Sequence, residues 1–474
     1  MGAECPRTEN GRDTMKSYRK IQRPTGGKTR FFTLFLALLL TLALLPSWGL
    51  AEEVETVAAP NPNILAQGAL LVDMKTGKMV YGKNEHAELY PASLTKIMTA
   101  LLTLEAIDTG KLTFDQKITA GPIVNTLPAD GSTVGLKEGE VMSVRNLLDC
   151  LLIPSANEAA CVLAETVGGS VDAFVDAMNK KAAALGCQNT HFVNPHGLHD
   201  PGHYTSPWDM YLITTAAMKY PTFMVICDTD RVVVPATNVS KERALLNTNY
   251  LICNRRIPEY KNPEAHGVKT GSTSQSGHCL VSTAQRNNKH FLSVIMGAER
   301  VQEGKRTIIR SFSETTRMFN WGFDNFRYMD LLDDGEPIDE IPVELSKTDH
   351  VTAVAGGPLE ALVPAGMKKD LVERTIHLDG DKLEAPVEEG QKLGSVTVSY
   401  NGVDYGTVDL IASHAAELSK FLQVERQALE LAQNKLVWAG AGVVGVAVAA
   451  LLIRNAIKNR RRSRGSGFSG YNGR

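Results

Sequence analysis

The sequence predicts an α+β protein in which helices pack around an antiparallel sheet, followed by a small β-rich domain and a C-terminal membrane helix. Helical and strand-like patterns share residues 60–325, short strand-like segments dominate residues 328–413, and an uncharged run covers residues 436–453. With 474 residues, 43% of them hydrophobic, the chain can bury several cores, which excludes a disordered or fibrous protein.

The first expected element is an export signal within residues 1–51. Phe31 to Leu45 is a run of apolar residues and Thr that follows a basic segment, and small residues near Ala51 suit a cleavage site. An uncleaved N-terminal anchor is the alternative, but the run is short for a hydrocarbon core about 30 Å thick.

Residues 60–325 contain the predicted helices and the main sheet. Residues 68–73 and 78–81 flank Thr76-Gly77, a pattern typical of a hairpin in which Gly supplies a positive φ. Residues 266–298 change to a strand pattern, with strands expected over 279–284 and 291–296. The predicted helices cover residues 91–107, 144–153, 158–166 and 171–185, and a further helix begins at Ser206-Pro207.

The sequence pattern of the C-terminal part predicts a β-rich domain that a helical stalk joins to a membrane helix. Strand-like pieces at 361–363, 392–399 and 408–411 indicate a β-rich domain over residues 328–413, and residues 414–435 read as a charged helical stalk. Residues 436–453 are long enough to span a membrane. Because Lys and Arg cluster in residues 454–474, we expect that tail in the cytoplasm and the body of the protein outside the cell membrane.

The charge distribution argues against nucleic acid as a partner. Residues 1–30 hold eight basic and three acidic side chains, and residues 454–474 hold seven basic and none acidic. Residues 31–453 are left with 35 basic and 49 acidic side chains, a net charge of −14. Phosphate binding needs a concentrated basic face, which this body lacks.

The seven cysteines are irregularly spaced and include no CxxC pair. Cys5 lies in the removable segment, so six thiols remain in the exported chain. This pattern favours free, buried thiols over a disulfide framework or a zinc knuckle.

Three short motifs carry the expected chemistry: Ser93-Leu-Thr-Lys96, Ser155-Ala-Asn157 and Lys269-Thr-Gly271. If Ser93 sits in the first turn of a helix, Lys96 shares its face and its amine can reach the hydroxyl. A Lys can serve as the base for an alcohol only when it is neutral. Burial and a second nearby cation would keep it neutral, and Lys269 is the candidate for that cation.

The remaining motif residues suit supporting roles. Ser155, at a break between helices, can pass a proton to the leaving amine, and Asn157 can orient Lys96 and a substrate amide. Thr270, expected at the start of an edge strand, offers a hydroxyl to a substrate carboxylate.

Gly271 and Ser272 complete the expected site. Gly271 lets a peptide approach the strand closely. The backbone N–H groups of Ser93 and Ser272 are the expected oxyanion donors.

Residues 60–413 resemble the low-molecular-mass penicillin-binding proteins, the serine D-alanyl-D-alanine carboxypeptidases of the S11 peptidase family. The resemblance implies a β-lactamase/DD-peptidase-like catalytic domain and cleavage of peptidoglycan stem peptides ending in D-Ala-D-Ala through an acyl-enzyme on Ser93. It also implies covalent inhibition by β-lactam antibiotics at the same serine. We expect no cofactor and no metal. The matching motifs are Pro91-Ala-Ser-Leu-Thr-Lys96, Pro154-Ser-Ala-Asn157, Asn194-Pro-His-Gly197, His266-Gly-Val-Lys-Thr-Gly271 and Asn320-Trp-Gly-Phe323.

The chain departs from this family at one position of interest. Family members often place an Arg ten residues before the Trp of the last motif, where it grips the substrate carboxylate. That position is Ser311 here, with Arg310 beside it and Arg306 nearby, so the carboxylate-binding Arg is unassigned.

Four alternatives stay open. A DD-endopeptidase would use the same chemistry on peptidoglycan cross-links. A class A β-lactamase shares the three motifs but adds a Glu, and residues 186–199 contain neither Glu nor Asp. A wall-binding protein without activity would not need every motif residue. A metallopeptidase could draw on one loop, although no HExxH is present; its candidate ligands are His191, His196, His199, Asp200 and His203.

Overall fold

The computed structural model describes residues 59–464 except positions 129, 130, 254, 256, 381 and 434. The export signal expected within residues 1–51 and the final part of the basic tail, residues 465–474, lie outside the described residues.

A five-stranded antiparallel sheet forms the centre of the first domain, in the order β2-β1-β9-β8-β7. The predicted first hairpin is confirmed, with Gly77 at φ 70° in its turn. The strand β7 forms one edge of the sheet, and it begins earlier than the sequence suggested, so Lys269 lies within the strand. The strands are β1 (Gly68–Asp73), β2 (Met79–Lys83), β7 (Ala265–Thr273), β8 (Gly277–Arg286) and β9 (Lys289–Ala298).

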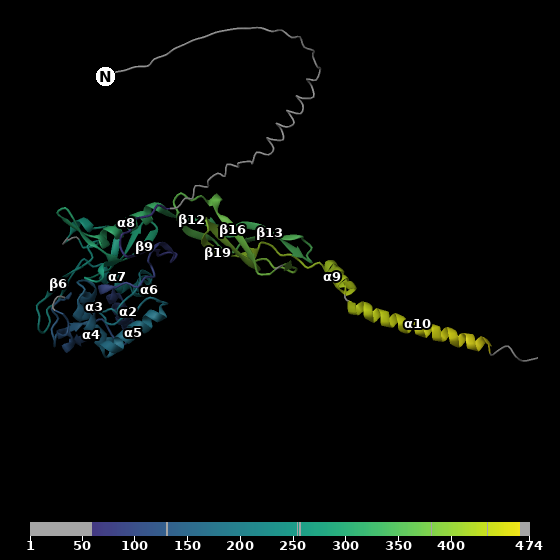
Figure 1. Cartoon of the computed structure of the whole chain (residues 1–474), viewed down its shortest axis with the longest axis horizontal. Helices are drawn as coiled ribbons and strands as arrows, with labels where there is room; N and C mark the ends of the chain where they lie inside the picture. Colours follow the sequence, from purple (N-terminus) through teal and green to yellow (C-terminus); the bar gives the residue numbers. More distant parts are fainter. Residues whose placement is uncertain are drawn as a thin grey trace, which may run out of the picture. The chain divides into compact units, whose positions relative to one another are not determined.

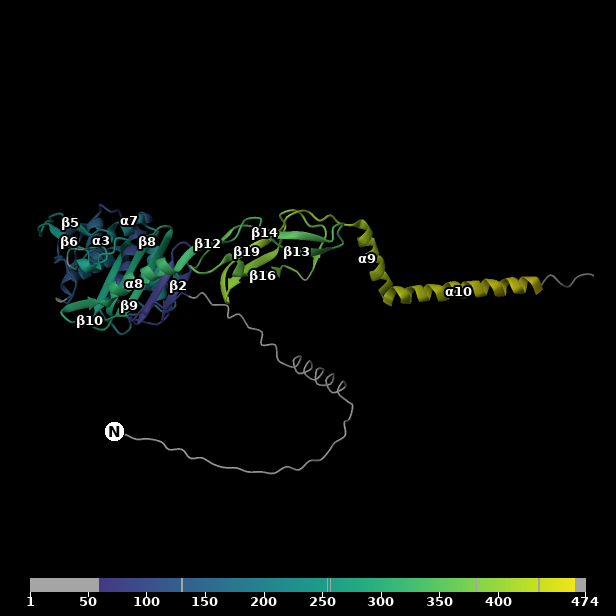
Figure 2. The same cartoon turned by 90° about the horizontal axis from the view of Figure 1, so that it is seen from above.

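Both faces of this sheet are buried, because alternate side chains of each strand point to opposite faces. Leu70 and Val72 of β1 pack into the core formed with the helices that follow. Ala69 and Leu71 pack on the other face, against helix α8 (Arg310–Asn325). Figure 2 shows α8 lying along strands β8 and β9. The result is a sheet between two helical layers.

The helices predicted from apolar periodicity are present, with small changes at their ends. The first begins as a 3₁₀ turn, η1 (Ala92–Thr95), before it continues as α2. Helix α6 is capped by Ser206, whose hydroxyl accepts from the backbone N–H of Asp209 at 3.1 Å. Figure 1 shows α2 to α6 gathered beside the sheet. Their bounds are α2 (Lys96–Asp108), α3 (Val144–Leu152), α4 (Asn157–Gly168), α5 (Val171–Ala184), α6 (Pro207–Met218) and α7 (Pro221–Cys227).

The described part of this domain also contains three two-stranded ribbons and two further 3₁₀ turns, η2 (Pro122–Asn125) and η3 (Pro258–Tyr260). The ribbon that precedes α8 matters for the site, because its second strand leads directly into that helix. The ribbons are β3 (Lys117–Thr119) with β4 (Val141–Ser143), β5 (Arg231–Val234) with β6 (Arg243–Leu246), and β10 (Arg300–Glu303) with β11 (Arg306–Ile309).

The second domain is built from strands, as the composition predicted. Its main sheet has the order β16-β18-β19-β14-β13-β17, and β12 pairs with β15. Val351, Val396, Val398 and Leu410 are fully buried in its core. One short 3₁₀ turn, η4 (Lys369–Leu371), precedes β16. The strands are β12 (Phe326–Leu332), β13 (Pro337–Glu344), β14 (His350–Ala355), β15 (Leu359–Pro364), β16 (Glu373–Leu378), β17 (Leu383–Glu384), β18 (Lys392–Tyr400) and β19 (Val403–Ala412).

Two helices follow the second domain: α9 (Lys420–Gln433) and α10 (Lys435–Arg464). Within the part of the chain that the structure describes, α10 is the one helix long and apolar enough to cross a membrane, over Trp438–Arg460, and that segment is unburied. The sequence predicted that the membrane segment ends at Ile453. The helix itself continues past Ile453 into the basic residues.

Candidate active site

Ser93 and Lys96 lie side by side at the start of the first helix of the domain. Ser93 is in the 3₁₀ turn η1 and Lys96 is the first residue of α2. Lys96 Nζ is 2.9 Å from Ser93 Oγ. The three-residue spacing therefore brings the amine to the hydroxyl, although the turn between them is 3₁₀ and not α-helical.

The amine of Lys96 has three neighbours that fix its orientation. Nζ lies 2.7 Å from Oδ1 of Asn157 and 2.8 Å from the carbonyl oxygen of His196, in addition to Ser93 Oγ. A neutral amine has two N–H groups and one lone pair. Because the amide and carbonyl oxygens only accept, they take the two N–H groups, and the lone pair is left for the Ser93 hydroxyl.

The surroundings of Lys96 favour its neutral form. The side chain is fully buried, and burial lowers its pKa well below the ordinary value of a lysine. The charge of Lys269 lowers the same pKa further. Burial also lowers the pKa of Lys269, to about 7. Lys269 therefore lies close enough to act as the expected second cation when it is protonated, and both burial and that charge favour the neutral form of Lys96.

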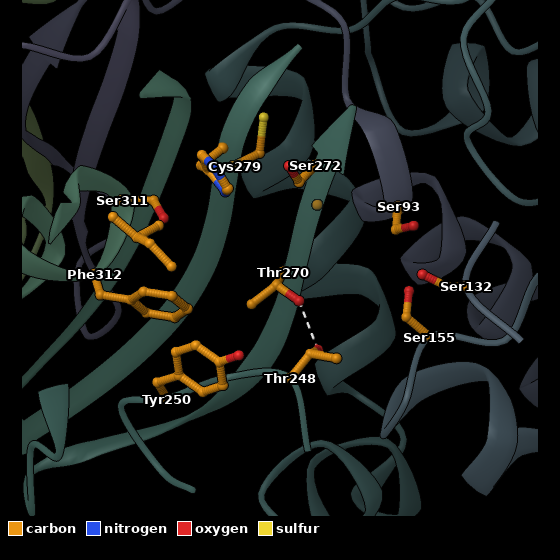
Figure 3. A pocket seen from close by; sticks show the side chains of 13 residues that line it. Ser93, Ser132, Ser155, Thr248, Tyr250, Thr270, Ser272, Cys279, Ser311 and Phe312 are labelled. Carbon is orange, nitrogen blue, oxygen red and sulfur yellow. Dashed lines mark hydrogen bonds between the residues drawn. The ribbon is translucent and has the colours of Figure 1, made fainter. Parts of the chain in front are cut away.

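Ser155 lies in the break between α3 and α4 with an unusual backbone. Its φ is 71°, a left-handed conformation that costs a non-glycine residue of order 1 kcal/mol or more. Its Oγ is buried and, among the described residues, has no hydrogen-bond partner. Figure 3 shows this hydroxyl in the same cavity as Ser93 and Ser132. An unpaired buried hydroxyl beside the candidate nucleophile is free to bond a substrate or to carry a proton.

The third motif borders the same cavity from the edge strand β7. Lys269 is buried behind the cavity wall, where its Nζ donates to the Thr270 carbonyl oxygen at 3.0 Å. Thr270 Oγ1 lies 2.6 Å from Oγ1 of Thr248, and either hydroxyl can donate. Ser272, one residue past the motif, is exposed and lines the cavity.

Gly271 lies directly against the turn that holds Ser93. A Cβ placed at Gly271 would come within 2.7 Å of the Pro91 carbonyl oxygen and 3.1 Å of the Ser93 nitrogen. The glycine was expected to make room for a peptide. In the structure it first makes room for the Ser93 turn.

We expect Gly271→Ala to slow acylation by a fluorescent penicillin about 10²-fold, because the added methyl displaces the Ser93 turn by a fraction of an ångström or more. The free energy of unfolding should fall by about 1–3 kcal/mol, measured by denaturant titration. Gly357→Ala is the matched control, since a Cβ there has no neighbour within 4 Å. If Gly271→Ala were acylated at the wild-type rate, the close contact between Gly271 and the Ser93 turn would be contradicted.

Every predicted site residue is found in or directly behind one cavity of about 200 Å³. Ser93, Ser155, Thr270, Gly271 and Ser272 line it. Lys96, Asn157 and Lys269 are buried and bond to groups at its wall.

Sequence reasoning missed several lining residues, namely Ser132, Thr248, Tyr250 and Phe312. They come from loops and from α8, and none belongs to a motif. Ser132 is tied to the site through its carbonyl oxygen, which accepts from the Asn157 backbone N–H at 2.9 Å.

The histidine-rich loop makes separate contacts. His203 Nε2 lies 2.7 Å from Thr95 Oγ1, and His191 Nδ1 lies 2.6 Å from the Gly202 carbonyl oxygen. His199 packs edge-on against Tyr90. Over the described residues, no three His, Cys, Asp or Glu side chains come together in a group that could hold a metal ion. His196 contributes its carbonyl oxygen to Lys96, so its backbone belongs to the site.

The six cysteines of the described residues are free, as predicted. Five of them are buried and Cys187 is half-buried. Burial raises the pKa of Cys150 and of Cys161 to about 12.

Comparison with known proteins agrees with this geometry. Residues 54–300 match the family model of D-alanyl-D-alanine carboxypeptidases, peptidase family S11, and residues 326–417 match the C-terminal domain of penicillin-binding protein 5. The chain is 33% identical over 337 residues to the D-alanyl-D-alanine carboxypeptidase DacF of Bacillus subtilis, covering 71% of this chain and 82% of that one. It is 29% identical to DacA of Escherichia coli K12 over 74% of this chain and 83% of the relative.

A solved structure shares both domains. Penicillin-binding protein 5 from Haemophilus influenzae matches with a TM-score of 0.59 and 30% identity, over 76% of this chain and 100% of that one. The matched regions contain all three motifs and the β-rich domain. The chain belongs to the S11 family of serine peptidases, the D-alanyl-D-alanine carboxypeptidases.

Proposed function

We propose that this protein is a serine D-Ala-D-Ala carboxypeptidase that removes the terminal D-alanine from peptidoglycan stem peptides. The observation that carries the proposal is the amine of Lys96, whose two N–H groups are taken by Asn157 Oδ1 and the His196 carbonyl oxygen. Its lone pair is thereby directed at Ser93 Oγ, 2.9 Å away. This is a nucleophile with its general base already in place.

The proposed reaction has two steps. Ser93 Oγ gives its proton to Lys96 Nζ and forms an ester with the penultimate D-alanine, while the C–N bond breaks. The departing nitrogen receives a proton through the Ser155 hydroxyl and leaves as D-alanine. Water then adds to the ester carbonyl, and the Ser93 hydroxyl and a shortened peptide are released.

The remaining site residues have supporting roles in this proposal. The backbone N–H groups of Ser93 and Ser272 stabilise the oxyanion. Lys269 and the Thr270 hydroxyl attract the substrate carboxylate, and Asn157 also bonds the substrate amide. A β-lactam would acylate the same Ser93 oxygen, because its ring amide presents a comparable carbonyl.

The site is proposed to work outside the cell membrane, held there by α10. The uncharged run of residues 436–453 and the unburied apolar surface of the helix support membrane insertion. The basic residues from Arg454 onward support a cytoplasmic tail.

The direct test is incubation with diacetyl-Lys-D-Ala-D-Ala followed by mass spectrometry. We expect release of one D-alanine and a peptide shortened by one residue. An unchanged peptide, together with no covalent adduct of benzylpenicillin, would refute the proposal. Activity that withstands a chelator separates this mechanism from a metallopeptidase.

A further inference from the structure

Thr248 and Thr270 place two hydroxyl groups against each other in the active-site cavity. Thr270 Oγ1 lies 2.6 Å from Thr248 Oγ1, and Figure 3 marks this contact with a dashed line. Among the described residues, neither hydroxyl has another hydrogen-bond partner. Both side chains line the cavity and are half-buried. The pair therefore has hydrogen-bonding capacity left for a bound substrate.

The loop that carries Thr248 is held by the asparagines on either side of it. Asn247 and Asn249 are 3% and 1% exposed. The Asn247 amide donates to the carbonyl oxygens of Cys227 and Thr229, each at 3.0 Å. Its Oδ1 accepts from the Asn249 backbone N–H at 2.9 Å. Of the three consecutive residues, Thr248 alone lines the cavity, because both asparagine side chains are bonded inside the protein.

The same loop is joined to two other parts of the site. Asn249 Nδ2 donates to the carbonyl oxygen of Gly267 in β7, the strand that also carries Thr270. The Thr248 backbone N–H donates to the Ile153 carbonyl oxygen at 3.2 Å, beside the break between α3 and α4. Thr248 is thus fixed against both the edge strand and the helix break, so its hydroxyl has a defined place relative to that of Thr270.

A carboxylate on the substrate determines which of the two hydroxyls donates. An ionised carboxylate only accepts hydrogen bonds, whereas each hydroxyl has one proton to donate and lone pairs that accept. If Thr270 donates its proton to the carboxylate, the bond between the two threonines must run from Thr248 to Thr270 Oγ1. Thr248 then has no proton left for the substrate. Its donation also makes the Thr270 hydroxyl a stronger donor, because linked hydrogen bonds polarise one another.

We infer that Thr248 is a positioning residue, whose hydroxyl donates to Thr270 Oγ1 and thereby turns the Thr270 proton toward the substrate carboxylate. The inference rests on the proposed function and deepens it, since it adds a residue outside the three motifs to the recognition of the carboxylate. Thr248 acts through Thr270 alone. Loss of its hydroxyl should therefore weaken substrate binding and spare the chemistry at Ser93.

The test measures kcat and KM for diacetyl-Lys-D-Ala-D-Ala with the full chain in detergent. Thr248→Val should raise KM about five- to tenfold and leave kcat within about twofold of wild type, because the bond it weakens is present in ground state and transition state alike. Thr248→Ala removes the same hydroxyl without a second methyl and should behave like Thr248→Val. Thr248→Ser keeps the hydroxyl and should restore the wild-type KM.

A double-mutant cycle separates positioning from general structural support. Adding Thr248→Val to Thr270→Val should raise KM by less than about twofold further, because no Thr270 hydroxyl is left to orient. Thr397→Val is the matched control, since Thr397 Oγ1 and Thr407 Oγ1 form a hydroxyl pair of the same kind, 2.9 Å apart, on β18 and β19. This control should leave both kinetic constants unchanged.

Three results would overturn the inference while the proposed function stands. They are a wild-type KM in both Thr248→Val and Thr248→Ala, a raised KM that Thr248→Ser does not restore, and additive effects of the two substitutions in the cycle. A wild-type protein that neither hydrolyses the peptide nor forms a penicillin adduct would instead reject the proposed function, and the inference with it.

Discussion

Replacing Ser93 with Ala will abolish both D-alanine release and covalent labelling by a fluorescent penicillin. The expected loss of kcat/KM is at least about 10⁴-fold, because no other hydroxyl in the cavity has an amine lone pair directed at it. Lys96 keeps its bonds to Asn157 and to His196, so the fold should persist. Mass spectrometry of the peptide and gel fluorescence of the protein check the two losses.

Ser274→Ala is the matched control for Ser93→Ala. Ser274 is an exposed serine in the turn after β7, and its hydroxyl bonds only the neighbouring Gln275 among the described residues. Ser274→Ala should be labelled by the fluorescent penicillin to the same extent as the wild-type protein. If Ser93→Ala were still labelled, the nucleophile would have to be another residue. Rapid recovery of free wild-type enzyme from benzylpenicillin would instead favour a β-lactamase.

Replacing Lys96 with Arg will lower kcat/KM about 10²–10⁴-fold, the usual contribution of a general base. Arginine stays charged at any accessible pH and cannot accept the Ser93 proton. Single-turnover acylation by a chromogenic cephalosporin measures the step directly. Lys420→Arg at the exposed start of α9 is the control, since the same exchange there alters no site contact.

The wild-type pH profile tests the same role for Lys96. A base must be neutral, so kcat/KM should fall as the pH drops below the lowered pKa of Lys96, and the fall should approach tenfold per pH unit. Lys269 helps to hold that pKa down, so Lys269→Gln should move this acid limb to higher pH. A profile without an acid limb, or wild-type activity in Lys96→Arg, would remove Lys96 as the base.

Much of the fold followed from local pattern. The β1–β2 hairpin, the helix break at Pro154-Ser155 and the paired strands β8 and β9 each depend on turn chemistry or periodicity within a short segment. The predicted start of β7 was wrong. Gly267 lies just before Lys269, and the pairing of β7 with β8 is irregular between His266 and Lys269. Both features interrupt the alternating pattern by which a strand is identified in the sequence.

The motif residues of the site could be predicted because order and spacing restrict them, whereas their partners could not. The carbonyl of His196 reaches Lys96 from a residue 100 positions away, and Thr248 meets Thr270 from a loop without a motif. The positive φ of Ser155 could not be predicted from its residue type, because non-glycine residues rarely adopt it. The ion pair between Arg310 and Glu299 also needed the structure, because no motif links the two residues.

The buried cysteines have a consequence for the chemical stability of the folded protein. Oxidation and alkylation proceed through the thiolate, and burial raises the pKa of Cys279 to about 11 and of Cys187 to about 12. Almost no thiolate therefore forms near neutral pH. The folded chain should resist peroxide and maleimide, and it should mature without disulfide-forming enzymes.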